Sequence, residues 1–323
     1  MQKVAILMAS YNGEVYIKKQ IQSIIDQSFH NWMLIIRDDG STDNTVSIIK
    51  EFQKIDKRIM LIEADSPYHG PFINFHYLIN YARNLSGFDY FFFADQDDLW
   101  ETNKLNLINK SFNKEGQPEL IYTDMSIIDG DDNIIIESNN AMRGIELPNK
   151  LQLYFNHSYI WGCTVAINKA LLEIVPEINI DQDFHIVEIL SHDNYFAKFA
   201  LEFGRVSFIN KQLIKYRRHS SNVSEISKVR VGLTESFRAL LYQFEKNSEK
   251  YANCYSQTLY MIENSRKVQK SSTLDEIESI IRNGGFKSIN YLIKNNIKKN
   301  QLIKTLAVYF VFIFGSYKKY LRR

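Results

Sequence analysis

The chain is poor in the residues that mark disulfide-rich, zinc-binding and low-complexity proteins. Its 323 residues include two cysteines, Cys163 and Cys254, five prolines and thirteen glycines. Two cysteines without CxxC spacing exclude a disulfide framework and a cysteine-based zinc site, and they fit a reducing compartment. So few prolines and glycines exclude collagen-like and low-complexity structure. With 45% hydrophobic and 24% charged residues, the chain has the composition of a globular protein with one large core and a smaller appended domain.

Several phosphate-binding and hydrolytic motifs are also missing. The sequence contains neither GxxxxGK[ST] nor GxGxxG, which excludes a P-loop and a dinucleotide-binding fingerprint. It contains no GxSxG, which excludes a serine nucleophile elbow. Any phosphate group that this protein binds is therefore expected to be held through a metal ion and not by a glycine-rich loop.

Charge is distributed unevenly along the chain. Residues 228–323 carry 18 Lys and Arg against 7 Asp and Glu, whereas residues 1–227 carry 21 against 30. Two regions of opposite charge usually meet different partners. The acidic part suits a bound cation, and the basic part suits an anionic surface.

The first half of the chain alternates buried strands with amphipathic helices. Short continuous apolar runs predict strands buried on both faces, and apolar residues at helical spacing predict the helices between them. Strands are expected at 4–8, 33–36, 59–62 and 90–93, and helices at 17–25, 45–54, 72–83 and from about 101. This alternation predicts an α/β fold with a Rossmann-like, mostly parallel sheet and flanking helices.

The second half changes character twice. Short strands are expected at 121–122, 164–167, 206–209 and 213–214, and a helix is expected from His192 to Phe203. From about residue 228 onward, long helical stretches dominate. We therefore expect an α/β domain over residues 1–227 and a basic C-terminal helical region over residues 228–323.

The C-terminal segment 306–323 combines nine consecutive apolar residues, 306–314, with a basic and aromatic tail. A transmembrane helix needs about 20 apolar residues, so the pattern favours a segment that lies in the membrane interface. The alternative is a core helix with a solvated tail. Because the N-terminus does not resemble a signal peptide, we expect a cytoplasmic protein, peripheral on the inner face of the plasma membrane. We expect no nucleic-acid partner, because the aromatic residues of this region follow helical spacing.

Polar loops follow three of the predicted strands, at the point where each strand ends. These loops are Ser10–Gly13, Asp38–Ser41 and Asp95–Asp98. Ligands of open α/β sheets bind at the carboxyl ends of the strands, so the three loops indicate one shared site. A carboxylate after the second strand, Asp38 or Asp39, can accept hydrogen bonds from a nucleotide base or from ribose hydroxyls.

The loop Asp95–Asp98 places three carboxylates within four residues. Like charges held so close repel one another unless a cation compensates them. Mn²⁺ and Mg²⁺ take carboxylate oxygens together with substrate phosphate oxygens, so we expect one of these ions here. The alternative, that these acids cap the helix beginning near Glu101, explains one or two of them but not three. Asp98 is the one that we assign to helix capping.

Taken together, these motifs resemble those of the family-two glycosyltransferases, which have the GT-A fold. The resemblance covers about residues 1–225 and rests on Ser10–Gly13, Asp38–Asp43 and Asp95–Trp100. The Asp-Gln-Asp-Asp form of the acidic loop resembles the bacterial rhamnosyltransferase branch, which builds cell-wall or capsular polysaccharide. Two further motifs carry the same resemblance, His192-Asp193 and Tyr216–Val223. The resemblance implies a catalytic domain over 1–227, with the nucleotide-sugar in its first half and the acceptor in its second half.

The resemblance also implies a role for individual residues. The donor nucleotide is expected to contact Ser10, Tyr11, Asn12, Asp38, Asp39 and Asp95. The metal ion is expected to bind Asp97 directly, with Asp95 beside it and His219 completing the metal shell or touching the diphosphate. Asp193 is expected to be the catalytic base, and its alternative role is to cap its helix. The family usually has Glu-Asp where this chain has His192-Asp193, so the aspartate is kept.

The implied activity is that of an inverting, metal-dependent glycosyltransferase. It would move a sugar, rhamnose from dTDP-rhamnose being our first choice, to a growing surface polysaccharide or a lipid-linked glycan. A UDP-hexose donor is the main alternative. Two further alternatives are a nucleotidyltransferase, which would release pyrophosphate, and a non-catalytic protein that binds nucleotide-sugar.

Overall fold

The computed structural model describes residues 2–63, 66–113, 115–143, 150–155, 159–219, 237–299 and 302–322. The chain divides into two compact units. The first comprises Met1–Met142 and Tyr159–Arg218, and the second comprises Arg143–Ser158 and His219–Arg323. The domain boundary predicted at 227/228 lies outside the described residues. The stretch Arg143–Ser158 groups with the second unit, although the sequence interpretation counted it in the α/β domain.

The first unit is built on one sheet whose first four strands are parallel. They neighbour one another in the order β3-β2-β1-β4, with β1 at Val4–Ser10, β2 at Trp32–Asp38, β3 at Ile59–Glu63 and β4 at Tyr90–Asp95. The helices between them are α1 at Ile17–Ile25, α2 at Thr45–Ile55 and α3 at Pro71–Arg83. The predicted alternation of strands and helices is therefore confirmed, with boundaries that differ by a residue or two.

Beyond β4 the sheet becomes mixed. It continues through β8 at Ala166–Asn168, β6 at Glu119–Ile128, β9 at Arg205–Arg217 and β5 at Leu99–Trp100, while β7 at Ile134–Ile136 pairs with β6. The two short strands predicted at 206–209 and 213–214 are one strand, β9, which runs parallel to β6. The strand predicted at 164–167 begins two residues later, because Gly162–Thr164 forms a 3₁₀ turn.

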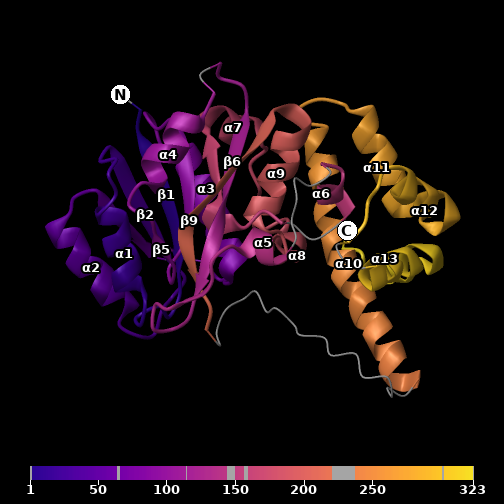
Figure 1. Cartoon of the computed structure of the whole chain (residues 1–323). Coiled ribbons are helices and arrows are strands. Elements are labelled where there is room, and N and C mark those ends of the chain that lie inside the picture. The colour runs from indigo at the N-terminus through magenta and orange to yellow at the C-terminus, as the bar shows by residue number, and fades with distance from the viewer. Residues whose placement is uncertain are drawn as a thin grey trace. The chain divides into compact units, whose positions relative to one another are not determined.

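Helices cover both faces of this sheet (Figure 1). On one face, alternate residues of β1 pack with α1, α2 and the helix α4 at Lys104–Ser111, as in the cluster of Ile6, Ile21 and Ile49. On the other face, the ring of Phe93 in β4 lies 6.1 Å from that of Phe75 in α3 and 6.2 Å from that of Phe196. Phe196 belongs to α9 at His192–Phe203. The shorter helices of the first unit are α5 at Asn139–Arg143, α7 at Lys169–Ile174 and α8 at Phe184–Val187.

The second unit is helical. It contains α6 at Gln152–Phe155, α10 at Phe237–Ser265, α11 at Ser272–Asn283, α12 at Gly285–Lys294, α13 at Leu302–Phe314 and a 3₁₀ turn at Ser316–Tyr320. The ring of Phe312 in α13 lies 5.1 Å from those of Tyr255 and Tyr317 in its core. The apolar run 306–314 therefore belongs partly to a core, while Phe310 and Phe314 are exposed. In the part of the chain described, no helix is both long enough and apolar enough to span a bilayer.

Candidate active site

The three polar loops meet at one edge of the first unit's sheet, as the sequence predicts. Strands β1, β2 and β4 are in register, so that Ser10 pairs with Asp38 and Ala9 pairs with Asp95. All three strands end at this level. The loops that follow them are consequently side by side, and their polar groups can act on one ligand.

Asp38 shapes the loop that follows β2. Its Oδ1 accepts the backbone N–H groups of Gly40 at 3.1 Å and Ser41 at 2.8 Å. Its Oδ2 accepts the hydroxyls of Ser10 at 2.9 Å and Ser41 at 2.6 Å. The bond from Ser10 holds the ends of β1 and β2 together, and the other three fix the loop after β2. A contact between Asp38 and a nucleotide stays a prediction.

Asp39 is held on three sides. The Arg37 guanidinium donates to its Oδ1 at 3.1 Å, and the backbone N–H of Gly70 donates to its Oδ2 at 2.7 Å. Nδ1 of His69 lies 3.4 Å from Oδ1. Because Arg37 also bonds Asn74 of α3 at 2.8 Å, the predicted base-binding carboxylate is fixed by groups from two elements.

Gln96 ties the acidic loop to the loop after β1. Its side-chain amide accepts the backbone N–H of Tyr11 at 2.9 Å and donates to the Tyr11 carbonyl at 2.8 Å. A Cβ at Gly13 would lie 2.2 Å from Oε1 of Gln96, so this approach requires glycine. Tyr11 itself is 54% exposed, which leaves its ring accessible. Asn12 accepts the backbone N–H of Thr42 at 2.8 Å.

The carboxylates of the acidic loop are crowded, with Asp98 buried and Asp95 and Asp97 half-buried. Burial, with the negative charges of Asp97 and Asp193, raises the pKa of Asp95 to about 7. Burial, with the charges of Asp97 and Asp95, raises the pKa of Asp98 well above its ordinary value. Oδ2 of Asp98 has no hydrogen-bond partner within the described residues. Such crowding is costly unless a cation is bound.

The assignment of Asp98 to helix capping is wrong. Helix α4 begins at Lys104 with Asn103 as its N-cap, further along the chain than the start predicted near Glu101. Asp98 instead accepts the backbone N–H of Arg217 at 3.1 Å. It therefore joins the acidic loop to the end of β9.

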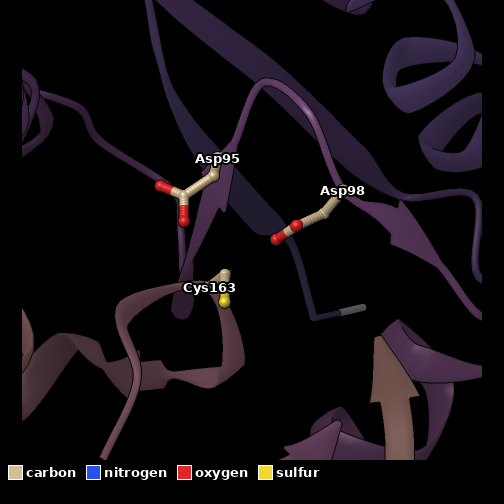
Figure 2. Close-up of side chains that lie close together, drawn as sticks. All are labelled: Asp95, Asp98 and Cys163. Atoms are coloured by element: carbon tan, nitrogen blue, oxygen red, sulfur yellow. The ribbon is translucent and has the colours of Figure 1, made fainter. Parts of the chain in front are cut away.

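A thiol and an amine that the sequence interpretation missed lie beside these acids. Ligand atoms of Asp95, Asp98 and Cys163 all lie within 4.8 Å of one another, and Figure 2 shows the three side chains. Burial raises the pKa of the Cys163 thiol well above its ordinary value, so the thiol stays protonated. Lys104 donates to the Cys163 carbonyl at 2.8 Å and lies 3.6 Å from the centre of the Trp100 ring. Burial lowers its pKa to about 7.

Asp193 faces the same group of acids. It lies in the first turn of α9, whose N-cap is Ser191, so the alternative of an N-cap role is excluded. A Cβ at Gly162 would lie 3.7 Å from Oδ2 of Asp193, and the next residue, Cys163, lies beside Asp95 and Asp98. Burial raises the pKa of Asp193, although hydrogen bonds from Ser191, Asn194 and Gly162 lower it. Such a carboxylate is suited to accept a proton at neutral pH.

His192, the residue that replaces the family's usual glutamate, points into the core. Its ring lies 4.0 Å from that of Phe75 and 4.6 Å from that of Phe93. Burial lowers the pKa of His192 well below its ordinary value, so the imidazole is neutral. His192 therefore packs against core aromatic residues and adds no positive charge next to Asp193.

The structure thus brings together most of the predicted residues: Ser10, Tyr11, Asn12, Asp38, Asp39, Asp95, Asp97 and Asp193. His219 begins the second unit, and its role as a ligand stays a prediction. The sequence interpretation missed Lys104 because a lysine on an amphipathic helix normally faces solvent. Gln96 and Arg217 lay inside the recognised motifs, but no role was assigned to them.

The residues present fit a hard divalent cation. Carboxylate oxygens are the ligands that Mn²⁺ and Mg²⁺ prefer. Burial and mutual repulsion raise the pKa of both Asp95 and Asp98, so the protein alone compensates their charged forms incompletely. A cation bound between Asp95 and Asp97 would relieve this repulsion.

Comparisons with known proteins agree with this geometry. The profile of Glycosyl transferase family 2 matches residues 5–175. The dTDP-rhamnosyl transferase RfbG of Shigella flexneri is 29% identical over 237 residues, which cover 72% of this chain and 76% of that protein. The UDP-Glc:alpha-D-GlcNAc-diphosphoundecaprenol beta-1,3-glucosyltransferase WfgD of Escherichia coli is 27% identical, with coverage of 68% and 79%.

A solved structure supports the fold. The crystal structure of S. aureus TarS 1-349 in complex with UDP-GlcNAc matches with a TM-score of 0.53 and 16% identity, over 91% of this chain and 73% of that chain. At that identity the likeness concerns the fold alone, and it agrees with the expected GT-A architecture. Because the family profile covers more than half of the sequence, the chain belongs to glycosyl transferase family 2 and is a glycosyltransferase.

Proposed function

We propose that this enzyme transfers a sugar, with inversion, from a nucleotide-sugar to a bacterial surface polysaccharide or a lipid-linked glycan. The observation that supports the proposal is the approach of Asp193, through Gly162 and Cys163, to the acidic loop at one sheet edge. Mn²⁺ or Mg²⁺, held by Asp97 and Asp95 with His219 as a further ligand, would neutralise the charge on the departing nucleoside diphosphate.

The residues of the chain would divide the reaction between them. Asp39, Tyr11 and their neighbours would hold the nucleotide. Asp193 would take the proton from the acceptor hydroxyl as its oxygen bonds to the anomeric carbon. The bond from that carbon to the diphosphate oxygen breaks as the new one forms on the opposite face, so configuration inverts.

Rhamnose from dTDP-rhamnose is our first choice of donor. Its support is the dTDP-rhamnosyl transferase RfbG, to which the chain is similar over most of its length. A UDP-hexose is the second candidate, supported by the similar glucosyltransferase WfgD. A panel of both donors with Mn²⁺ separates them, because the correct donor raises the melting temperature and releases its nucleoside diphosphate.

The substitution Asp193→Asn tests the catalytic assignment. We expect the variant to bind donor and Mn²⁺ with unchanged affinity, because the amide keeps the shape of the carboxylate. Turnover should fall by about 10²- to 10⁴-fold, the usual contribution of a general base. Loss of donor binding would instead place Asp193 in the nucleotide site, and release of pyrophosphate by the wild type would indicate nucleotidyl transfer.

We further propose that the enzyme works at the inner face of the plasma membrane through residues 306–323. Leu302, Leu306, Phe310 and Phe314 recur at four-residue spacing on α13 and are exposed. After Glu278 the sequence contains ten Lys and Arg and no Asp or Glu. An apolar stripe within a basic region suits an anionic lipid surface.

Because Phe312 and Tyr317 lie in the core, substitution tests this contact better than deletion. We expect wild-type protein to sediment with phosphatidylglycerol vesicles, and Phe310→Ser with Phe314→Ser to bind at least about tenfold less. The matched control is Ile134→Ser with Ile135→Ser, two exposed apolar residues of β7 in the other unit. Equal binding of wild type and the phenylalanine variant would contradict the membrane contact.

A further inference from the structure

Arg217 is an arginine with no exposed surface, at the last position of β9. Arginine is seldom buried so completely unless its guanidinium meets several partners. Here the partners come from segments far apart in the sequence: the acidic loop, the turn after β6 and the start of α1.

Toward the acidic loop, Arg217 makes two hydrogen bonds. Its backbone N–H donates to Oδ1 of Asp98 at 3.1 Å, and its Nε donates to the backbone carbonyl of Asp97 at 2.8 Å. The pairing of Leu99 with Lys215 in β5 and β9, continued by two residues, places Arg217 opposite Asp97. These contacts therefore fix the backbone of Asp97, and so the position from which its side chain extends.

Away from the acidic loop, the guanidinium is anchored. Its Nη1 donates to the Asp129 carbonyl at 3.0 Å and forms an ion pair with Asp132. Its Cζ lies 4.5 Å from the centre of the Tyr16 ring, at the start of α1. Lys19 of α1 also pairs with Asp132, at 2.5 Å. Arg217 thus links the acidic loop to α1, the helix that follows the predicted nucleotide loop Ser10–Gly13.

We propose that Arg217 is a positioning residue that presents Asp97 to the divalent cation. This inference rests on the proposed metal-dependent function. The guanidinium is a planar fork that reaches acceptors in several directions at once, and a lysine ammonium cannot replace this geometry. Loss of a partner that orients a metal ligand typically weakens metal affinity about 10- to 100-fold.

The test is a titration of Mn²⁺, with UDP or dTDP present, into wild type, Arg217→Lys and the control Arg58→Lys. Arg58 resembles Arg217 in pairing with an aspartate, Asp56, and in lying over an aromatic ring, Trp32. It precedes β3, at the opposite end of the strands from the acidic loop. The control therefore carries the same chemical change without touching the site.

We expect Arg217→Lys to bind Mn²⁺ about 10- to 100-fold more weakly, and Arg58→Lys to bind it as wild type does. Raised Mn²⁺ should restore the turnover of Arg217→Lys, so that the apparent KM for the metal rises while kcat recovers. A purely structural role would instead lower kcat and Tm without any rescue by metal, and that result overturns the inference. So does unchanged Mn²⁺ affinity in Arg217→Lys.

If Arg217→Lys does not fold, Asp132→Asn carries the test, since Asp132 is partly exposed and has φ of 71°, which asparagine tolerates. Weaker Mn²⁺ binding at an unchanged Tm supports the inference, and unchanged binding overturns it. Failure of wild type to bind Mn²⁺ with either nucleotide overturns the metal-dependent function as well. The two failures are therefore distinguishable.

Discussion

Gly162 lies so close to His192 that a Cβ at position 162 would come within 2.6 Å of Nε2 of the imidazole. The same Cβ would lie 3.7 Å from Oδ2 of Asp193. The backbone of Gly162 thus covers both residues at the start of α9. Since the next residue is Cys163, beside Asp98, one short turn supports the proposed catalytic carboxylate and the acidic loop together.

We predict that Gly162→Ala loses most transfer activity while keeping donor binding. The imidazole ring is confined by Phe75 and Phe93, so the added methyl group must move the start of α9 or the turn itself. Displacing a catalytic group by about 1 Å can reduce the rate about 100-fold. Turnover and the melting-temperature shift caused by nucleotide with Mn²⁺ provide the two measurements. Wild-type turnover in this variant would show that the turn does not position Asp193.

Lys104 is predicted to stabilise the fold as a buried counter-charge to Asp95 and Asp98. Replacing it with methionine keeps the apolar stem over Trp100 but leaves the carboxylates without their nearest cation. Methionine also leaves the buried Cys163 carbonyl without its donor, and an unsatisfied buried polar group typically costs about 1 to 3 kcal/mol. Denaturant unfolding without metal measures the loss. The matched control is Lys110→Met on the exposed side of the same helix, which should change stability by less than about 0.5 kcal/mol.

The parallel half of the sheet could be predicted because its signals are local. Apolar runs such as Val4 to Met8 are buried on both faces, and the residues that end them fall at one edge for purely topological reasons. The resemblance to a family then supplied roles for the residues at that edge. The role proposed for Asp193 comes from this resemblance, since almost one hundred residues separate it from Asp95.

The supporting residues could not be predicted because nothing local marks them. A lysine at position 104 looks like a solvent-facing helix residue, and only the arrival of Cys163 from a distant turn encloses it. Arg217 depends in the same way on the pairing of β9 with β5 and β6. The strand pairs of this mixed half of the sheet are set by long-range contacts, which the alternation of apolar runs does not encode.

Stability should fall as pH decreases below neutrality, in part because of His76. Its Nε2–H donates to the Leu190 carbonyl at 2.8 Å, and burial lowers its pKa from 6.5 to about 4. The positive charge of Arg83 disfavours its protonation too, whereas the nearby His192 is neutral. The unfolded chain therefore binds a proton that the folded chain rejects, so stability is full above pH 6.5 and is lost as pH falls toward 4.

Between pH 7 and pH 5 this single group should account for about 2 kcal/mol of the loss. In His76→Gln the amide can still donate to Leu190 but does not titrate, so the fall in unfolding free energy over this range should be smaller by that amount. His30→Gln, at an exposed histidine, is the control. Identical pH profiles of wild type and His76→Gln would contradict the assignment.

Two phenylalanines of α13 should separate its core face from its exposed face. Phe312 has no exposed surface and packs against Tyr255 and Tyr317, whereas Phe314 is 68% exposed. Phe312→Ala should therefore destabilise the second unit by about 3 kcal/mol or more through the cavity that it leaves. Phe314→Ala should change its stability by less than about 0.5 kcal/mol. Hydrogen exchange of the α13 amides measures this unit separately from the first.

The same two phenylalanines, Phe312 and Phe314, also distinguish an effect on stability from an effect on membrane binding. If the exposed stripe contacts lipid, Phe314→Ala should weaken binding to anionic vesicles and leave the hydrogen-exchange protection of α13 unchanged. Phe312→Ala should reduce that exchange protection. Exposed aromatic residues contribute to interfacial binding through the apolar area that they bury in the bilayer. Equal exchange protection in the two variants would mean that α13 packs differently from the arrangement in which Phe312 meets Tyr317. Because the same Phe→Ala change is made at two positions only two residues apart in one helix, the contrast reflects the face on which each side chain lies.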